Sequence, residues 1–286
     1  MAEEGNAMRV RGGTHTVGVI GWPVEHSLSP AIHNAAFGAL DLDWVYVPLP
    51  VPPDGLADAV RGLRVLGFSG TNVTMPHKTE AASICDELSD DAERLQAVNT
   101  IVVTPTALVG HNTDTPGFDR FLRLDAGFDP ADRDALVFGA GGAARSCALA
   151  LSRAGLGRLH VAVRDPAGAG ALTSGLEGMS TEVSVVPIAD AAGLDVPLVV
   201  NATPLGAQGE ELPHPALHPD VLVVDLLYRP SVTPLQTAAR AAGATVFGGL
   251  GLLLHQAALA FELWTGRTPP LERMSAAALV ELAEPS

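Results

Sequence analysis

The sequence predicts an α/β protein built from two lobes, each an open, mostly parallel sheet with helices. Short apolar segments bounded by glycine, proline or polar residues alternate with longer segments of helical periodicity, a pattern typical of such sheets. The alternation runs through residues 14–114, resumes after a glycine-rich turn within residues 115–250, and ends in apolar helical segments at 251–286. With 286 residues the chain is long enough for two domains. We expect one domain at 14–114, completed by C-terminal helices at 251–286 that return to it, and a second at 115–250.

The composition argues against several classes of partner. The net charge of −15 disfavours nucleic acid and anionic membrane surfaces. No run of about 18 apolar residues predicts a membrane span, and residues 1–13 lack the apolar core of a signal peptide. The two cysteines, Cys85 and Cys147, match no metal-binding spacing. We therefore expect a cytoplasmic protein with reduced thiols and no metal site.

Lys78 is the only lysine among the 17 Lys and Arg residues of the chain. Arginine, with a pKa above about 12, keeps its proton in proteins, whereas burial and neighbouring charges can shift the pKa of a lysine. We interpret Lys78 as a general acid/base, against the alternative of a surface lysine without a role. A strand expected at 69–74 places Asn72 and Thr74 on one face, before a helix expected at 78–88.

Asp114 is the carboxylate that could act with Lys78. It follows Asn112 and Thr113 after an apolar stretch, so it is either a helix cap or a partner of the lysine. An ion pair favours the charged lysine and burial favours the neutral one, an opposition that tunes a group for proton transfer. Asn99, in a strand expected at 97–103, precedes this segment.

Two serines, Ser27 and Ser29, lie between a strand expected at 16–20 and a helix expected at 31–40. Pro30 suits the first turn of that helix, and Ser29 suits its N-cap. A helix start with free N–H groups and two nearby hydroxyls predicts a carboxylate site. The alternative is that Ser29 serves only as a cap.

A glycine-rich turn follows the strand expected at 135–138 and opens a helix to about residue 154. It reads GAGGAAR and fits the G-x-G-x-x-A pattern, whose glycines let a pyrophosphate approach a helix N-terminus. The strand–turn–helix context predicts a Rossmann dinucleotide-binding domain. The expected cofactor contacts in this turn are Gly139, Ala140, Gly141, Gly142, Ala143 and Arg145.

The residues at the end of the next strand, expected at 159–164, determine whether NADP or NAD is bound. Arg164 fits the 2′-phosphate of NADP, with Arg145 as a second contact. Asp165 would instead bind the ribose hydroxyl of NAD and repel a phosphate. We favour NADP and keep NAD as the alternative.

Polar and aromatic residues follow two further strands, expected at 198–201 and 221–225, where the nicotinamide should lie. The cofactor contacts expected near these strand ends and at a flexible glycine joint, 248–251, are Thr203, Leu226 and Gly249. An apolar helix expected at 252–264 carries Gln256, which is either a ligand or a hydrogen-bonded core residue.

Read together, these motifs resemble the shikimate dehydrogenase family over nearly the whole chain, in family order. The matching segments are HSLSPAIHN at 26–34, NVTMPHK at 72–78, AVNT at 97–100, NTD at 112–114, GAGGAAR at 139–145, NATPLG at 201–206, DLLY at 225–228, GLLLHQA at 251–257 and WTG at 264–266. The family's NADP-specific members usually have Asn-Arg-Thr where this chain has Val163-Arg164-Asp165.

The resemblance implies a role for each matching residue. Ser27 and Ser29 would hold the substrate carboxylate, and Lys78 with Asp114 would be catalytic. The other implied substrate contacts are Asn72, Thr74, Asn99, Tyr228 and Gln256. The implied reaction is the reversible, NADPH-dependent reduction of 3-dehydroshikimate to shikimate in aromatic amino acid biosynthesis. The alternatives are an NAD-dependent quinate/shikimate dehydrogenase and a non-catalytic dinucleotide-binding regulator, and a homodimer is compatible with each.

Overall fold

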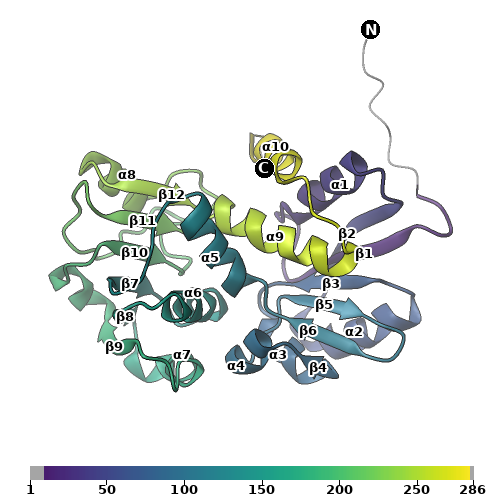
Figure 1. Cartoon of the computed structure of the whole chain (residues 1–286), viewed down its shortest axis with the longest axis horizontal. Coiled ribbons are helices and arrows are strands. Elements are labelled where there is room, and N and C mark those ends of the chain that lie inside the picture. Colours follow the sequence, from purple (N-terminus) through teal and green to yellow (C-terminus); the bar gives the residue numbers. More distant parts are fainter. Residues whose placement is uncertain (1–9, 284–286) are drawn as a thin grey trace, which may run out of the picture. The chain divides into compact units, whose positions relative to one another are not determined.

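The computed structural model describes residues 10–283, which divide into two compact units (Figure 1). Unit 1 contains the described residues up to Thr113 and from Gln256 onward, and unit 2 runs from Asp114 to His255. Helix α9 (Leu250–Thr265) contributes residues to both units. Within residues 10–283, no helix has the length and apolar character needed to cross a membrane.

Unit 1 is built on a six-stranded sheet of order β2-β1-β3-β5-β6-β4. Its strands are β1 (His15–Gly21), β2 (Trp44–Pro50), β3 (Gly70–Val73), β4 (Glu87–Leu88), β5 (Thr100–Val103) and β6 (Leu108–His111). Strand β1 runs parallel to β2 and β3, and β4 runs parallel to β6, whereas β5 is antiparallel to β3 and β6. The sheet is therefore mostly parallel, as predicted, with β5 as its one antiparallel strand.

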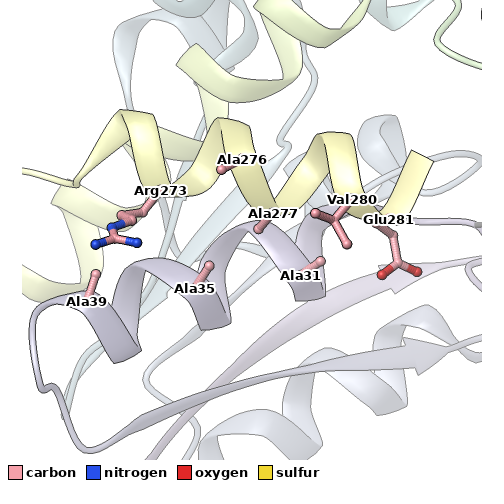
Figure 2. A pocket seen from close by; sticks show the side chains of 8 residues that line it. All are labelled: Ala31, Ala35, Ala39, Arg273, Ala276, Ala277, Val280 and Glu281. Carbon is pink, nitrogen blue, oxygen red and sulfur yellow. The ribbon is translucent and has the colours of Figure 1, made fainter. Parts of the chain in front are cut away.

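The helices of unit 1 follow the strands closely in sequence. They are α1 (Ser29–Ala39), α2 (Leu56–Val65) after the short 3₁₀ turn η1 (Pro53–Gly55), α3 (Lys78–Ile84), α4 (Asp90–Leu95) and α10 (Leu271–Ala283). Helix α10 packs on α1 through alanines that let the two backbones approach, which confirms the predicted return of the C-terminal helices. A pocket of about 570 Å³ lies along this seam, with Arg273 and Glu281 near its two ends (Figure 2).

Two predicted elements of unit 1 have the wrong length. The helix that begins at Lys78 ends at Ile84 and not at residue 88, because the chain then forms β4. Asp86 fixes this change, since its backbone N–H donates to Leu108 O (2.9 Å) and its carboxylate accepts from Leu108 N (2.7 Å). The strand expected at 97–103 begins only at Thr100.

Unit 2 is a six-stranded, all-parallel sheet of order β12-β11-β10-β7-β8-β9. Its strands are β7 (Asp134–Phe138), β8 (Arg158–Val163), β9 (Glu182–Pro187), β10 (Leu198–Asn201), β11 (Leu222–Asp225) and β12 (Thr245–Gly248). Every residue of β10 and β11 is buried, as expected of parallel strands covered on both faces. The strand order reverses at β7, which is the topological switch point where such sheets bind ligands.

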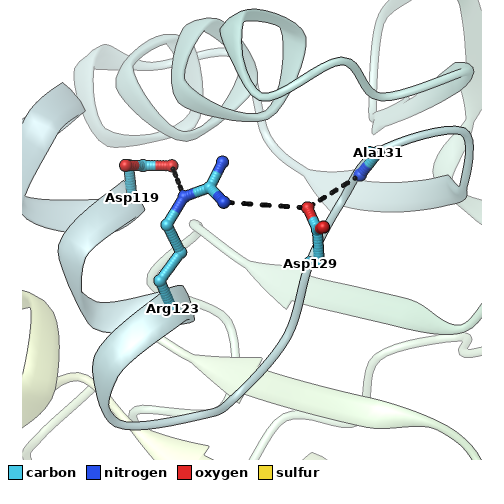
Figure 3. A network of polar contacts seen from close by, with 4 residues as sticks. All are labelled: Asp119, Arg123, Asp129 and Ala131. Carbon is cyan, nitrogen blue, oxygen red and sulfur yellow. Dashed lines mark hydrogen bonds and ion pairs between the residues drawn. The ribbon is translucent and has the colours of Figure 1, made fainter.

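Helices and 3₁₀ turns connect these strands. They are α5 (Asp114–Leu124), α6 (Gly142–Arg153), η2 (Pro166–Ala169), α7 (Gly170–Gly175), η3 (Ile188–Gly193) and α8 (Pro234–Ala241), followed by the first residues of α9. The connection from α5 to β7 carries a surface network in which Arg123 contacts Asp119 (2.9 Å) and Asp129 (3.8 Å), and Asp129 accepts from Ala131 N (Figure 3). Exposed pairs of this kind contribute at most about 1 kcal/mol each.

The glycine joint predicted at 248–251 is shorter than expected. Gly248 ends β12 and Leu250 begins α9, so Gly249 alone separates two regular elements. Its N–H donates to Leu227 O (3.1 Å), and its carbonyl accepts from Leu253 N (3.1 Å). Gly249 is needed here for close packing, because a Cβ at this position would overlap the backbone of Leu226.

Gly70 shows the same constraint in unit 1 and provides a test of its packing. The Trp264 indole donates to Ile101 O (3.1 Å), and a Cβ added at Gly70 would overlap both groups. Gly70→Ala should therefore lower the free energy of unfolding by roughly 2–4 kcal/mol, measured by urea denaturation. Gly62→Ala in α2 is the matched control: a Cβ there meets nothing within 4 Å, so it should be neutral or stabilising by about 0.5–1 kcal/mol. If Gly70→Ala and Gly62→Ala had the same free energy of unfolding, the close packing described at Gly70 would be contradicted.

Candidate active site

The predicted carboxylate site lies where β1 leads into α1. Ser29 is buried and Ser27 is partly exposed. Helix α1 begins at Ser29 itself, so the prediction that Ser29 is its N-cap is wrong. Ser27 Oγ instead accepts the backbone N–H of Ser29 (3.3 Å). The Ser29 side chain is close enough to the Tyr46 hydroxyl to favour a lower pKa there.

Tyr46 is a buried residue of β2 that the sequence did not single out. Its hydroxyl donates to Asn72 Oδ1 (2.7 Å), and burial raises its pKa well above the usual value, so it keeps its proton. The imidazole of His33 stacks on its ring, with 4.5 Å between centroids. Burial lowers the pKa of His33 to about 3, so this ring is neutral at neutral pH. The Tyr46 hydroxyl therefore holds the amide of Asn72 beside the uncharged imidazole of His33.

Asn72 has a single possible orientation. Its Nδ2 donates to Asn99 O (3.2 Å) and to Thr100 Oγ1 (2.9 Å), which uses both amide hydrogens. Because Asn99 O can only accept, the amide cannot be flipped. Toward a further ligand, Asn72 can therefore only accept a hydrogen bond, through Oδ1.

Asn99 joins this network to α9. Its Oδ1 accepts from Thr113 N (2.7 Å), and its Nδ2 donates to Thr113 Oγ1 (2.9 Å) and Gln256 Oε1 (3.3 Å). Gln256, which is 157 residues away in sequence, is thus brought to the ends of the unit 1 strands. The structure places three of the predicted residues in one hydrogen-bonded set, namely Asn72, Asn99 and Gln256.

Thr74 and Lys78 lie in the turn between β3 and α3. The backbone N–H of Thr74 donates to Ile20 O (2.8 Å), and the carbonyl of Thr74 accepts from His77 N (2.9 Å). Lys78 is the first residue of α3 and is partly exposed, and its carbonyl accepts from Val98 N (2.8 Å). The His77 ring is buried and hydrogen-bonds Val51 O through Nε2 (2.7 Å). The turn that carries Lys78 is therefore anchored on both sides.

Asp114 and Tyr228 belong to unit 2. Asp114 is buried and begins α5 directly after Thr113, so it is not a cap preceding the helix. Tyr228 follows β11 and is partly buried, and burial raises the pKa of its hydroxyl.

The glycine-rich turn of unit 2 fits a dinucleotide. Gly139 has φ +102°, and a Cβ there would press on Thr203 and Ala202, so the turn requires glycine at this position. Around Gly141 nothing lies within 4 Å of an added Cβ, and α6 begins immediately afterwards at Gly142. An open cradle in front of a helix N-terminus is the arrangement that binds a pyrophosphate. Arg145 lies in the second turn of α6, and burial lowers its pKa.

Arg164 and Asp165, at the end of β8, have different surroundings. The Asp165 carboxylate accepts from Ala167 N (3.0 Å) and caps η2. Arg164 is exposed, and among the described residues nothing hydrogen-bonds its guanidinium. Arg164 is thus available to an external anion, whereas Asp165 is used within the chain.

The comparisons with known proteins agree with one another. Two family models match the chain, the shikimate dehydrogenase substrate binding domain at residues 19–101 and the shikimate 5′-dehydrogenase C-terminal domain at 249–279. The shikimate dehydrogenase (NADP(+)) of Rubrobacter xylanophilus is 48% identical over 274 residues, covering 93% of this chain and 96% of the relative.

Solved structures give the same picture. Shikimate 5-dehydrogenase from Thermus thermophilus, in complex with NADP(H) and shikimate, is 38% identical with a TM-score of 0.83, and the match covers 93% of this chain and 99% of that one. The enzyme from Listeria monocytogenes, in complex with shikimate and NAD, is 34% identical with a TM-score of 0.87, covering 94% and 97%. The resemblance inferred from the motifs is confirmed: the chain belongs to the shikimate dehydrogenase family.

Proposed function

We propose that this protein catalyses the reversible, NADPH-dependent reduction of 3-dehydroshikimate to shikimate, a step of aromatic amino acid biosynthesis. Its family membership supports this proposal, as do the relatives named for the same NADP-dependent activity. The observation that carries it is the hydrogen-bonded set of Asn72, Asn99 and Gln256 with the Tyr46 hydroxyl, which gathers polar groups for a small polyhydroxylated acid.

We assign substrate binding to the residues that match the family's substrate contacts, most of them in unit 1; Tyr228 and Asp114 are assigned to the substrate by the same resemblance. Ser27 and Ser29 would hold the carboxylate, and Thr74 would bind a hydroxyl beside them. Asn72 would accept a hydrogen bond from a substrate hydroxyl, since both of its amide hydrogens are used within the protein. Asn99 and Gln256 would orient the ring from the opposite end of the network.

We assign the proton transfer to Lys78, with Asp114 as its charged partner. NADPH supplies the hydride that reduces the carbonyl carbon. Lys78 donates a proton to the carbonyl oxygen as the hydride arrives and removes it in the reverse direction. A lysine suits this role in a chain whose other basic side chains are all arginine.

We assign NADP binding to unit 2. The turn from Gly139 to Ala143 would hold the pyrophosphate at the N-terminus of α6. Arg164 would read the 2′-phosphate, with Arg145 as a second cationic group. Asp165 does not oppose this assignment, because its carboxylate is directed to the backbone of η2. Thr203, Leu226 and Gly249 would contact the nicotinamide half.

A cytoplasmic location and a homodimeric assembly complete the proposal. Cys85 and Cys147 form no disulfide, as is usual for proteins of reducing compartments. Sedimentation of the purified full-length chain tests the dimer, and a monomeric mass at micromolar concentration would contradict it.

Lys78→Ala should reduce kcat for shikimate oxidation by at least about 100-fold, because a general acid/base typically contributes that much. The Kd for NADPH should stay within about twofold, since the residue lies in the other unit. Steady-state kinetics and a fluorescence titration with NADPH measure the two effects.

Lys78→Arg is the matched control, because arginine keeps the positive charge but cannot release its proton near neutral pH. It should bind shikimate and lack turnover. If either variant retained more than about a tenth of the wild-type kcat, Lys78 would not be the acid/base.

Arg164→Ala should raise the KM for NADP⁺ by about 10-fold or more and leave the KM for NAD⁺ within about twofold, because a charge-assisted contact to the 2′-phosphate is lost. Asp165→Ala is the control: it removes only the cap of η2, so any effect should be small and equal for both cofactors. Equal losses for NADP⁺ and NAD⁺ in Arg164→Ala would show that this arginine does not select the cofactor.

A further inference from the structure

Asp225 is a fully buried carboxylate at the end of β11, with 0% of its surface exposed. Three donors converge on it: Asn201 Nδ2 (3.0 Å), Thr233 Oγ1 (2.6 Å) and Leu227 N (3.2 Å). Within residues 10–283, no lysine, arginine or histidine forms an ion pair with it. Burial raises its pKa, and the three hydrogen bonds act in the opposite direction. Burying a charge without a cationic partner destabilises the folded protein, so a carboxylate at this position needs an explanation.

The carboxylate joins the two loops that follow β10 and β11. Asn201 Oδ1 accepts from Thr203 N (3.0 Å) and Thr203 Oγ1 (2.7 Å), which fixes the loop after β10. Thr233 caps α8 by accepting from Gln236 N (3.2 Å). These contacts position the loops, but they do not require a charge. The amide of an asparagine at 225 could accept from Asn201 and Leu227 and donate to Thr233 Oγ1.

The position of Asp225 on the sheet indicates what the charge can act on. Asp225 pairs with Asn201, which pairs with Phe138, the last residue before the glycine-rich turn. Arg164 follows β8, on the other side of β7, and is assigned to the adenosine half. A dinucleotide bound across the switch point therefore places its nicotinamide half over the ends of β10 and β11. The nicotinamide ring carries a positive charge when oxidised and none when reduced.

We propose that the buried carboxylate of Asp225 stabilises the oxidised nicotinamide relative to the reduced one, and so sets the preference of the protein for NADP⁺ over NADPH. This inference rests on the proposed function, because it requires NADP to bind unit 2. Its physical basis is that a unit charge shielded from water acts on another charge over several ångströms. The effect requires no direct contact, so Asp225 acts from beneath the loops that carry Thr203 and Leu226.

The test is the ratio of two dissociation constants in the full-length protein without substrate. The Kd for NADP⁺ is measured by calorimetry and the Kd for NADPH by fluorescence. Asp225→Asn keeps the hydrogen-bond geometry and removes the charge, so the ratio Kd(NADP⁺)/Kd(NADPH) should rise at least about fivefold, mainly through weaker binding of NADP⁺. Asp225→Ser, which leaves room for water, provides the same readout if the asparagine variant does not fold.

Thr233→Val is the control for a purely structural role. It removes a hydrogen bond and the cap of α8 but keeps the charge, so it should lower the melting temperature and leave the ratio within about twofold. A ratio unchanged in both Asp225 variants, or both constants raised by the same factor, would overturn the inference. If the wild-type protein bound neither form of NADP, the proposed function itself would fail.

Discussion

Complete hydrogen bonding of buried amide groups is the constraint on which the candidate site depends. An amide removed from water must find partners for both hydrogens and for its oxygen, so each partner dictates an orientation. Asn72 and Asn99 satisfy this demand through Tyr46, Thr100, Thr113 and Gln256. Segments distant in sequence are thereby aligned at the ends of the unit 1 strands, and the orientations are set before any ligand binds.

The buried polar cluster of unit 2 is subject to the same constraint, and the carboxylate of Asp225 lies at its centre. Asp225 holds the loops after β10 and β11, and Asn201 and Thr233 distribute its hydrogen bonds to neighbouring segments. In both units the polar cluster is buried at the strand ends; in unit 1 it includes residues assigned to the substrate, and in unit 2 it lies beneath residues assigned to the cofactor. Rigid support of this kind keeps ligand-binding groups in place at the cost of burying polar atoms.

The two sheets could be predicted from the sequence because their strands are short, apolar and bounded by clear turns. Strand β10 was predicted with its observed bounds, and the glycine-rich turn lies between β7 and α6 as expected. The glycine joint was predicted too long because the sequence does not show that glycine is needed for close packing, as at Gly249. Helix α3 was too long in the prediction because Asp86 redirects the chain through contacts with Leu108, which is distant in sequence.

The candidate residues were predictable where a motif combined chemistry with spacing, as at Lys78 and in the glycine-rich turn. Tyr46 was missed because a tyrosine in a strand is usually a core residue, and its partner Asn72 is far away in sequence. Likewise, Arg164 and Asp165 could not be separated from the sequence, since either could face a ribose. Their surroundings separate them: the carboxylate caps η2, and the guanidinium remains exposed.

The most direct measurement of the central claim is the rate of change of nicotinamide absorbance at varied substrate concentrations, with shikimate or quinate each paired with NADP⁺ or NAD⁺. The account predicts turnover with shikimate and NADP⁺, and much lower kcat/KM for the other three pairs. Turnover of quinate with NAD⁺ as the preferred pair would contradict it and would make Asp165 the residue that selects the cofactor.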